Sequence, residues 1–333
     1  MSSHAAAQSR RYAVVAPCRN EAKFMRRTLD SLVNQSVPPS LLVVVDDGST
    51  DETPAILAEY AARFPFIRVV TRRDRGTRSV GPGVIEAFYA GLETVDLAIF
   101  EYVCKLDLDL VLPPRYFELL MLRMEAEPRL GTCSGKAYYP GPGNAEGSFA
   151  GELISEGIGD DVSVGASKFY RVTCFRQIGG FVREVMWDGI DCHRCRMLGW
   201  IAGSWDDPDL RFIHLRPMGT SHQGIWTGRK RHGFGQYFMG TSLAFITASA
   251  LYRLAKPPVF LGSVAIWWGY VSSWLTGKPR HGDPAFRRFL RRYQWRALLQ
   301  GKSRAISRLN QEQASKWDPV AIINWPAGNT PRL

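Results

Sequence analysis

The chain has 333 residues, 45% of them hydrophobic and 22% charged, which is ordinary for a globular enzyme and enough to bury a full core without disulfide bonds. Its net charge of +11 favours an anionic partner, such as a nucleic acid, an acidic membrane surface or phosphate groups. The first residues contain no long apolar segment, so we expect no signal peptide and a cytoplasmic protein with free thiols.

The first half of the sequence alternates β-rich runs with helical patterns. Strands are expected at Tyr12–Ala16, Leu41–Val45, Ile67–Thr71 and Leu97–Val103, and apolar residues at helical spacing lie between them. This order predicts a doubly wound, Rossmann-like α/β sheet that is flanked by helices. In such sheets, ligands bind beyond the carboxyl ends of the strands.

Three of the expected strand ends are polar. The first strand is followed by P-C-R-N-E at 17–21, the second by D-D-G-S-T-D at 46–51, and the fourth by Asp107 and Asp109. Two carboxylates one residue apart can converge on Mg²⁺ or Mn²⁺, which prefer oxygen ligands and share them with phosphates. Taken alone, a D-x-D pair in a loop is more often simply hydrated.

The same segments contain residues that are suited to begin helices. Asn20 can cap the first helix, and Ser49 with Glu52 fits a capping box for the second. One cap needs one oxygen acceptor, whereas three carboxylates lie within 46–51. The excess favours a ligand-binding role, such as accepting a hydrogen bond from a uracil ring or a ribose hydroxyl.

Together, the three segments resemble glycosyltransferase family 2, whose members have the GT-A fold. That family shows P-x-x-N-E, V-D-D-G-S-x-D and D-x-D after successive strands, and this sequence has PCRNE, VVDDGSTDET and KLDLD in the same order. The resemblance covers about residues 11–220. It implies a transferase that uses a nucleotide-diphosphate sugar, with UDP favoured, and a divalent metal, Mn²⁺ or Mg²⁺.

The resemblance also implies roles for individual residues. Asp47 is expected to contact the base, with Asp46 beside it. Asp107 is expected to contact the ribose or the metal, and Asp109 to bind the metal and the diphosphate. Further donor contacts are expected from Pro17, Arg19 and Glu21, and from either Arg75 or Arg78 in the basic stretch that follows the third strand.

A fourth segment, W-D-G-I-D at 187–191, resembles the part of the family that carries the catalytic base. Counting back from Gly199-Trp200 places Asp188 on the catalytic aspartate of the family. The glutamate that precedes it in the family is replaced here by Trp187, and Asp191 therefore competes for the role of base. The simpler interpretation of Asp188 is a helix N-cap.

Three further residues are candidates with open alternatives. His214 follows a strand-like run and is expected either as a third metal ligand or as a structural histidine. Arg229 and Arg231 can clamp a diphosphate, because the guanidinium fork matches phosphate geometry. They can equally form a hydrated basic flank that faces lipid headgroups.

The expected chemistry follows from these groups. A metal-bound diphosphate leaves without a general acid, so one base, Asp188, suffices to take the proton of the acceptor hydroxyl. The resemblance implies an inverting course. The sequence lacks the Q-x-x-R-W signature of processive family members, which argues against a polymer synthase.

The C-terminal part changes character. Gly233–Tyr252 and Pro257–Gly277 contain no charged residue and are rich in aromatic and small residues. Each could span a membrane, lie in its interface or pack in a soluble core. The basic connection between them disfavours export, so we favour in-plane helices on the inner face of the plasma membrane. A lipid-linked saccharide is then the expected acceptor.

These observations divide the chain into a GT-A catalytic domain at 11–225, a helical, partly apolar, membrane-associating region at 226–310 and a tail at 311–333. The glycine-dense stretch at 141–165 is expected to be a long loop over the substrate cleft.

Other classes of function fit less well. A basic module that binds nucleic acid or lipid without catalysis suits the charge, but no known nucleic-acid-binding signature is present, and nucleic acid is not an expected partner. A dinucleotide oxidoreductase would need G-x-G-x-x-G after the first strand, where this chain has P-C-R-N-E. The retained aspartates argue against a relative that has lost catalysis.

Overall fold

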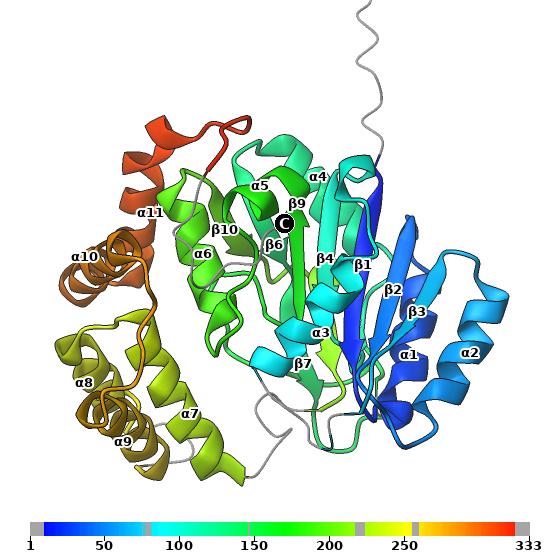
Figure 1. The fold of residues 1–333 in the computed structure, drawn as a ribbon, viewed down its shortest axis with the longest axis horizontal. Coiled ribbons are helices and arrows are strands. Elements are labelled where there is room, and N and C mark those ends of the chain that lie inside the picture. Colours follow the sequence, from blue (N-terminus) through cyan, green and yellow to red (C-terminus); the bar gives the residue numbers. More distant parts are fainter. Residues whose placement is uncertain are drawn as a thin grey trace, which may run out of the picture.

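A computed structural model describes residues 10–74, 76, 81–145, 147–216, 224–254 and 260–323. Its centre is a seven-stranded sheet with the order β10-β6-β9-β4-β1-β2-β3 (Figure 1). Strand β9 is antiparallel to both of its neighbours, and the other pairs are parallel. The strands are β1 (Tyr12–Cys18), β2 (Leu41–Asp46), β3 (Ile67–Thr71), β4 (Tyr102–Leu106), β6 (Leu130–Ser134), β9 (Ser167–Arg171) and β10 (Ile201–Ser204).

Helices cover both faces of this sheet, as the uninterrupted apolar runs require. Along β1, Val14 belongs to one core and its neighbour Val15 to the other, because successive side chains of a strand point to opposite faces. The first core is completed by α1 (Ala22–Val33), α2 (Thr53–Arg63) and α4 (Tyr116–Ala126). The second is completed by α3 (Pro82–Leu92), α5 (Val172–Gln177) and α6 (Trp187–Met197). The expected doubly wound α/β architecture is confirmed.

One expected strand was placed too early. Leu97–Ile99 forms a 3-10 helix, and the carboxylate of Asp96 accepts the N–H of Ala98 at its start. This local bond competes with strand pairing, so β4 begins only at Tyr102. The shift leaves the strand end, and therefore the D-x-D pair, where the sequence put it.

A second, smaller sheet brings distant segments to the end of β4. Its order is β5-β11-β7-β8. Strand β11 pairs antiparallel with β5, which sets His214 opposite Leu110 and therefore beside Asp109. Strand β8 lies within the stretch expected to be a long loop. The strands are β5 (Leu110–Val111), β7 (Lys136–Pro140), β8 (Leu153–Ser155) and β11 (Arg211–His214), and a 3-10 helix (Pro208–Leu210) precedes β11.

The C-terminal helices fall into two groups. Helices α7 and α9 cross at very close range, because a Cβ on Gly233 would lie 1.9 Å from the carbonyl oxygen of Ile266. Phe286 on α10 and Ile306 on α11 belong to the second core of the sheet, as do Phe238 and Met239 at the end of α7. The region expected as one unit at 226–310 therefore includes helices that complete the catalytic core. The helices are α7 (Gly224–Met239), α8 (Leu243–Tyr252), α9 (Leu261–Leu275), α10 (Pro284–Gln300) and α11 (Lys302–Glu312), followed by a 3-10 helix (Ala314–Lys316).

Within the described ranges, the helices are all too short or too polar to cross a lipid bilayer.

Candidate donor and catalytic site

Hydrogen bonds join the loops that follow β1 and β2 at the carboxyl end of the sheet. Asn20 has a left-handed backbone (φ 54°), and its side-chain oxygen accepts the N–H of Thr50 at 2.8 Å. In return, the Ser49 hydroxyl accepts the N–H of Asn20 at 2.9 Å. The N-caps of α1 and α2 are Glu21 and Glu52, neither with a capping side-chain bond. The expectation that Asn20 and Ser49 cap these helices was therefore wrong, because both residues join one loop to the other.

Two arginines connect the loops that follow β1, β2 and β3. Arg19 donates to the backbone carbonyl of Asp47 at 2.7 Å and to the carboxylate of Asp74 at 2.6 Å. Arg72, directly after β3, pairs with the Asp47 carboxylate at 2.7 Å. Asp46 accepts the N–H of Ser49 at 2.9 Å and is almost fully buried. The structure thus brings Arg19, Asp46 and Asp47 together, with Pro17 at the end of β1.

The D-x-D pair follows β4 and splits into two environments. Asp107 is about one-third exposed and pairs with the buried ammonium of Lys105 at 2.5 Å. Asp109 is buried, and the guanidinium of Arg216 donates to its Oδ2 at 2.6 Å. The same guanidinium nitrogen contacts Glu21 at 2.9 Å. Arg216 therefore ties the D-x-D loop to the loop after β1.

Asp109 and His214 form a charged pair with shifted acidity. Burial alone would raise the pKa of Asp109, but His214 and Arg216 outweigh it and lower that pKa to about 2. Burial would lower the pKa of His214, but the carboxylates of Asp109 and Glu156 raise it to about 10. At neutral pH, the ligand-free site therefore holds an ionised Asp109 against a protonated imidazole.

This pair has features that fit a divalent cation. The Oδ1 atom of Asp109 is buried without a hydrogen-bond partner, and it lies 3.6 Å from Nε2 of His214. Glu156 contacts Nδ1 of the same ring at 3.1 Å, an arrangement that commonly orients metal-binding imidazoles. In the described part of the chain, no three acidic, histidine or cysteine side chains form a complete metal cluster. Remaining ligands would come from donor phosphates and water, as is usual for Mg²⁺.

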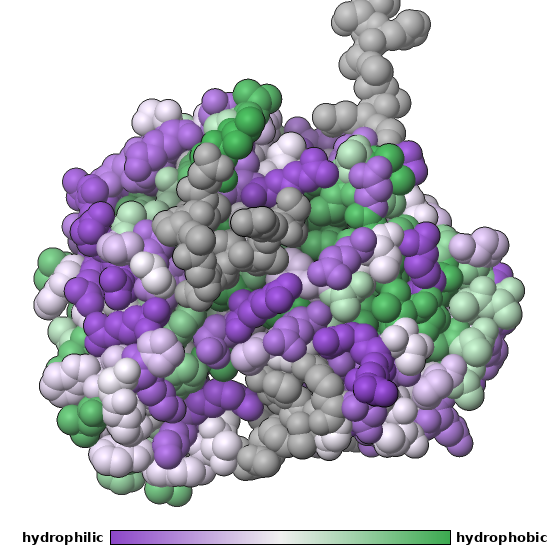
Figure 2. Space-filling view, in the orientation of Figure 1, coloured by the Kyte–Doolittle hydropathy of each residue, from purple (hydrophilic) through white to green (hydrophobic). Residues whose placement is uncertain are grey.

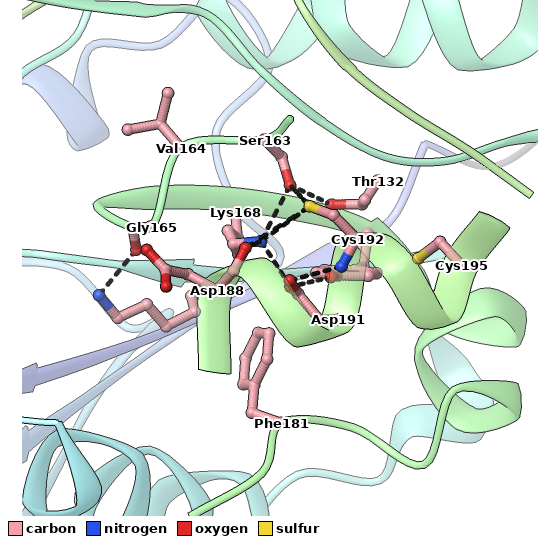
Figure 3. A network of polar contacts seen from close by, with 12 residues as sticks. Thr132, Ser163, Val164, Gly165, Lys168, Phe181, Asp188, Asp191, Cys192 and Cys195 are labelled. Carbon is pink, nitrogen blue, oxygen red and sulfur yellow. Dashed lines mark hydrogen bonds and ion pairs between the residues drawn. The ribbon is translucent and has the colours of Figure 1, made fainter. Parts of the chain in front are cut away.

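The candidate bases Asp188 and Asp191 lie one turn apart on α6 in contrasting surroundings (Figure 3). Asp188 is partly exposed, and its carboxylate rests against Gly165. Asp191 is fully buried, pairs with Lys168 at 2.5 Å and accepts a hydrogen bond from Tyr170. A base must reach the acceptor hydroxyl, and the buried carboxylate of Asp191 is the less accessible of the two candidates.

Burial and pairing act in opposite directions in this pair. Burial raises the pKa of Asp191, and the contacts with Lys168 and Tyr170 oppose that rise. Burial would lower the pKa of Lys168, but the carboxylate of Asp191 reverses this and holds that pKa above its ordinary value. The backbone N–H of Cys192 also donates to Asp191 at 2.6 Å. Asp191 thus accepts three hydrogen bonds, which is the condition for keeping a carboxylate ionised in a core.

Four more arginines were expected to contact the donor. Arg229 and Arg231 lie on α7, and no carboxylate among the described residues forms an ion pair with either. Arg75 and Arg78 lie outside the described residues.

Four residues of the site were missed from the sequence: Arg72, Lys105, Glu156 and Arg216. Two of them carried a usable signal, because Arg72 follows a strand directly and Arg216 stands two residues after His214. For Glu156, no sequence pattern could have paired it with a histidine 58 positions away. Lys105 was hidden because a lysine inside a strand is ordinarily assigned to an exposed face.

A mixed α/β sheet with acidic loops at its carboxyl end and a partly exposed aspartate on a neighbouring helix defines a GT-A glycosyltransferase domain. The solved structure of GalNAc-T7 with UDP, GalNAc and Mn²⁺ shares this fold, with a TM-score of 0.50 and 12% identity over 80% of this chain and 57% of that one.

Sequence comparison points to a family of transferases. The profile of Glycosyl transferase family 2 matches residues 13–150, so this part of the chain is similar to that family. Chondroitin synthase of Escherichia coli is 31% identical over 108 residues, which are 32% of this chain and 14% of that protein. Poly-beta-1,6-N-acetyl-D-glucosamine synthase of Staphylococcus epidermidis is 27% identical over 119 residues, or 35% and 26%. The chain therefore matches only a minor part of these relatives.

Proposed function

We propose that this protein transfers a sugar from a nucleotide-diphosphate donor, with UDP favoured, to an acceptor hydroxyl with inversion at the anomeric carbon. One observation carries the proposal. Lys105 binds both Asp107 of the D-x-D loop and the carbonyl oxygen of Gly165, and the carboxylate of Asp188 rests on Gly165. Asp107, as a donor-binding carboxylate, and Asp188, as an accessible base, would thus be linked through Lys105 and Gly165.

The donor would bind across the carboxyl ends of β1, β2 and β4. Asp47 would accept a hydrogen bond from the nucleotide base, while Arg72 and Arg19 fix the loop that carries Asp47. Asp109 and His214, with Asp107 nearby, would hold a divalent cation, which supplies the positive charge that a departing diphosphate needs. Binding of the cation would require His214 to release its ring proton, because only the neutral imidazole is a metal ligand. Arg216 adds a second cation at the same place.

The acceptor would enter on the side of Asp188. A carboxylate that is partly exposed can receive the proton of an incoming hydroxyl, and a departing diphosphate needs no protonation by the protein. One displacement by that hydroxyl on the face opposite the leaving group inverts the anomeric carbon. Buried Asp191 takes no part in this step, because its carboxylate is occupied by Lys168 and Tyr170.

The acceptor is proposed to be a lipid-linked saccharide at the inner face of the plasma membrane. Helices α8 and α9 expose large apolar side chains, and no acidic residue occurs between Asp209 and Asp283. In the space-filling view, the surface over these helices is mostly pale, with hydrophobic residues at its outer margin (Figure 2). Aromatic side chains with nearby cations suit the headgroup layer of an anionic bilayer. The exposed set is Leu251, Tyr252, Phe260, Leu261, Trp267, Trp268, Trp274 and Leu275.

Calorimetric titration with UDP, with and without Mn²⁺, tests the donor site. We expect binding that depends on the metal and is lost in Asp109→Ala, with the exposed acid Asp209→Asn as a matched control that binds normally. Failure to bind UDP, GDP or any other nucleotide would refute the proposed activity. Binding that survives Asp109→Ala would refute the assignment of the metal.

Vesicle sedimentation tests the membrane surface. Vesicles with anionic lipid should bind the protein, and the double change Trp267→Ser and Trp268→Ser should weaken that binding. Trp295→Ser is the control, because Trp295 is comparably exposed but lies on α10. Equal losses in the two variants, or equal binding to neutral vesicles, would contradict a specific role for α8 and α9.

A further inference from the structure

Two buried lysines face each other beneath the proposed base. Lys105 on β4 and Lys168 on β9 are register partners in the antiparallel pair, and their side chains are 2% and 0% exposed. Their ammonium groups lie 5.1 Å and 5.9 Å from the centre of the Trp187 ring. Trp187 thus offers its face to two cations, which gives a physical reason for an aromatic residue where the family has glutamate.

Each lysine donates hydrogen bonds both to a carboxylate and to a backbone carbonyl oxygen. Lys105 donates to Asp107 at 2.5 Å and to the carbonyl oxygen of Gly165 at 2.9 Å. Lys168 donates to the carbonyl oxygen of Asp188 at 2.8 Å as well as to Asp191. The first turn of α6 is therefore fixed through its backbone, and the Gly165 segment is fixed to the donor loop (Figure 3).

Gly165 is the contact point between these two parts. A Cβ added at Gly165 would lie 2.8 Å from Oδ2 of Asp188 and 3.3 Å from its Cβ. Real Cβ atoms essentially never come as close as the first of these distances, so a side chain here would displace the carboxylate. The missing side chain of Gly165 is what allows Asp188 to lie against the backbone that Lys105 holds.

We propose that Gly165 and Lys105 are positioning residues, which set the carboxylate of Asp188 at a fixed place relative to the donor loop at Asp107. The inference rests on the proposed function, because it concerns the same base. Asp107 would contact the donor, and the base must meet a hydroxyl on the opposite face of the sugar. A rigid link between the two transmits the position of the donor to the base, and displacement of a reacting group by about 1 Å can cost roughly 100-fold in rate.

Gly165→Ala tests the link directly. We expect kcat to fall by roughly 100-fold while the dissociation constant for UDP and the midpoint of thermal unfolding stay unchanged. Gly203→Ala is the control: Gly203 is buried, whereas Gly165 is partly buried, but a Cβ added at Gly203 would meet nothing closer than 3.5 Å. An unchanged kcat in Gly165→Ala would overturn the proposal, and so would a loss confined to KM.

A double-variant cycle separates positioning from general damage. If Gly165 acts only through the base, Gly165→Ala should cause no further loss in an Asp188→Asn background. Lys105→Met provides a second route, because it removes both bonds of the ammonium, and its effect on kcat should vanish in the same background. Full additivity in both cycles would overturn the link. If Asp188→Asn alone had no effect, the proposed base itself would be refuted, which distinguishes the two failures.

Discussion

The ion pairs at the donor end of the sheet and those at the first turns of α6 differ in their exposure to solvent. At the donor end, arginines on the loops bridge the carboxylates, and Asp107 and Arg216 are still partly open to solvent. On α6, the ion pair of Lys168 and Asp191 has no exposed side-chain surface at all. The first arrangement can exchange its partners for a ligand, whereas the second cannot be opened without leaving a buried charge unpaired.

This difference assigns the two regions different tasks. At the donor end, Asp107 and Arg216 are partly hydrated and cost little to rearrange, which suits a site that must bind and release an anionic nucleotide, although Asp109 and His214 beside them are buried. Charges that are buried and fully paired fix a geometry, which suits the support of a base. Asp188 belongs to both regions. Its backbone carbonyl is bound by buried Lys168, whereas its side chain is partly exposed.

The largest effect is expected from Asp188→Asn, which removes the base without touching the donor end. We expect kcat to fall by about 100- to 10,000-fold, the usual contribution of a general base, while affinity for UDP is retained. Steady-state kinetics beside calorimetry measures both, with Asp209→Asn as the control. An equal loss of affinity for UDP would show that Asp188 also contributes to donor binding, which contradicts separate tasks for the two regions.

Lys168→Met is expected to act on stability. It leaves the carboxylate of Asp191 buried without its cation, which typically costs about 3–5 kcal/mol of unfolding free energy. Denaturant unfolding followed by circular dichroism measures this loss. Adding Asp191→Leu should restore part of the stability, because no charge is then left unpaired. A Lys168→Met variant as stable as the parent chain would show that the pair is not a rigid support.

The donor end could be predicted from the sequence because its signals are local. Each motif is a strand followed directly by acidic residues, so alternation of apolar runs and polar ends placed Asp47 and Asp109 at strand ends. Their roles at the donor came from the resemblance to the family and stay predictions. What remained hidden at this end was pairing. The sequence showed the histidine but gave no means of seeing that β11 sets His214 against Asp109.

The base region could be predicted less well, because its function depends on contacts between strands. The sequence could not decide between Asp188 and Asp191, since both have helical spacing and only burial separates them. Gly165 lay in a glycine-dense stretch with nothing to distinguish it. The same limit applies to α10 and α11, which were expected within the membrane-associating region and whose apolar faces pack on the second core of the sheet.

A smaller effect is expected from Asp47→Asn at the donor end. The change removes the negative charge that pairs with Arg72. The same carboxylate would accept a hydrogen bond from the nucleotide's uracil ring. Affinity for UDP should fall roughly 10-fold, or about 1.5 kcal/mol, with little change in stability. Glu52→Gln, an exposed acid in the same loop, is the control for calorimetry. A stability loss as large as that of Lys168→Met would mean that both regions are rigid supports.

The smallest effect is expected where charges cluster at the surface. Arg292, Arg296 and Arg308 all converge on Glu312, at 3.0, 2.8 and 3.3 Å. Because such contacts are hydrated and screened, Glu312→Gln should cost less than about 1 kcal/mol of unfolding free energy, and less still at high salt.

The pH dependence of that cost gives a sharper measurement. Hydrogen bonding to Arg296, opposed by slight burial, lowers the pKa of Glu312 from its ordinary value. A lowered folded-state pKa means that the stabilisation is present at neutral pH and is lost as the pH falls through that pKa. Urea unfolding of the parent chain and Glu312→Gln should therefore differ at neutral pH and converge in acid. A difference that persists in acid would assign the effect to packing, and one as large as for Lys168→Met would show that burial does not set the strength of ion pairs here.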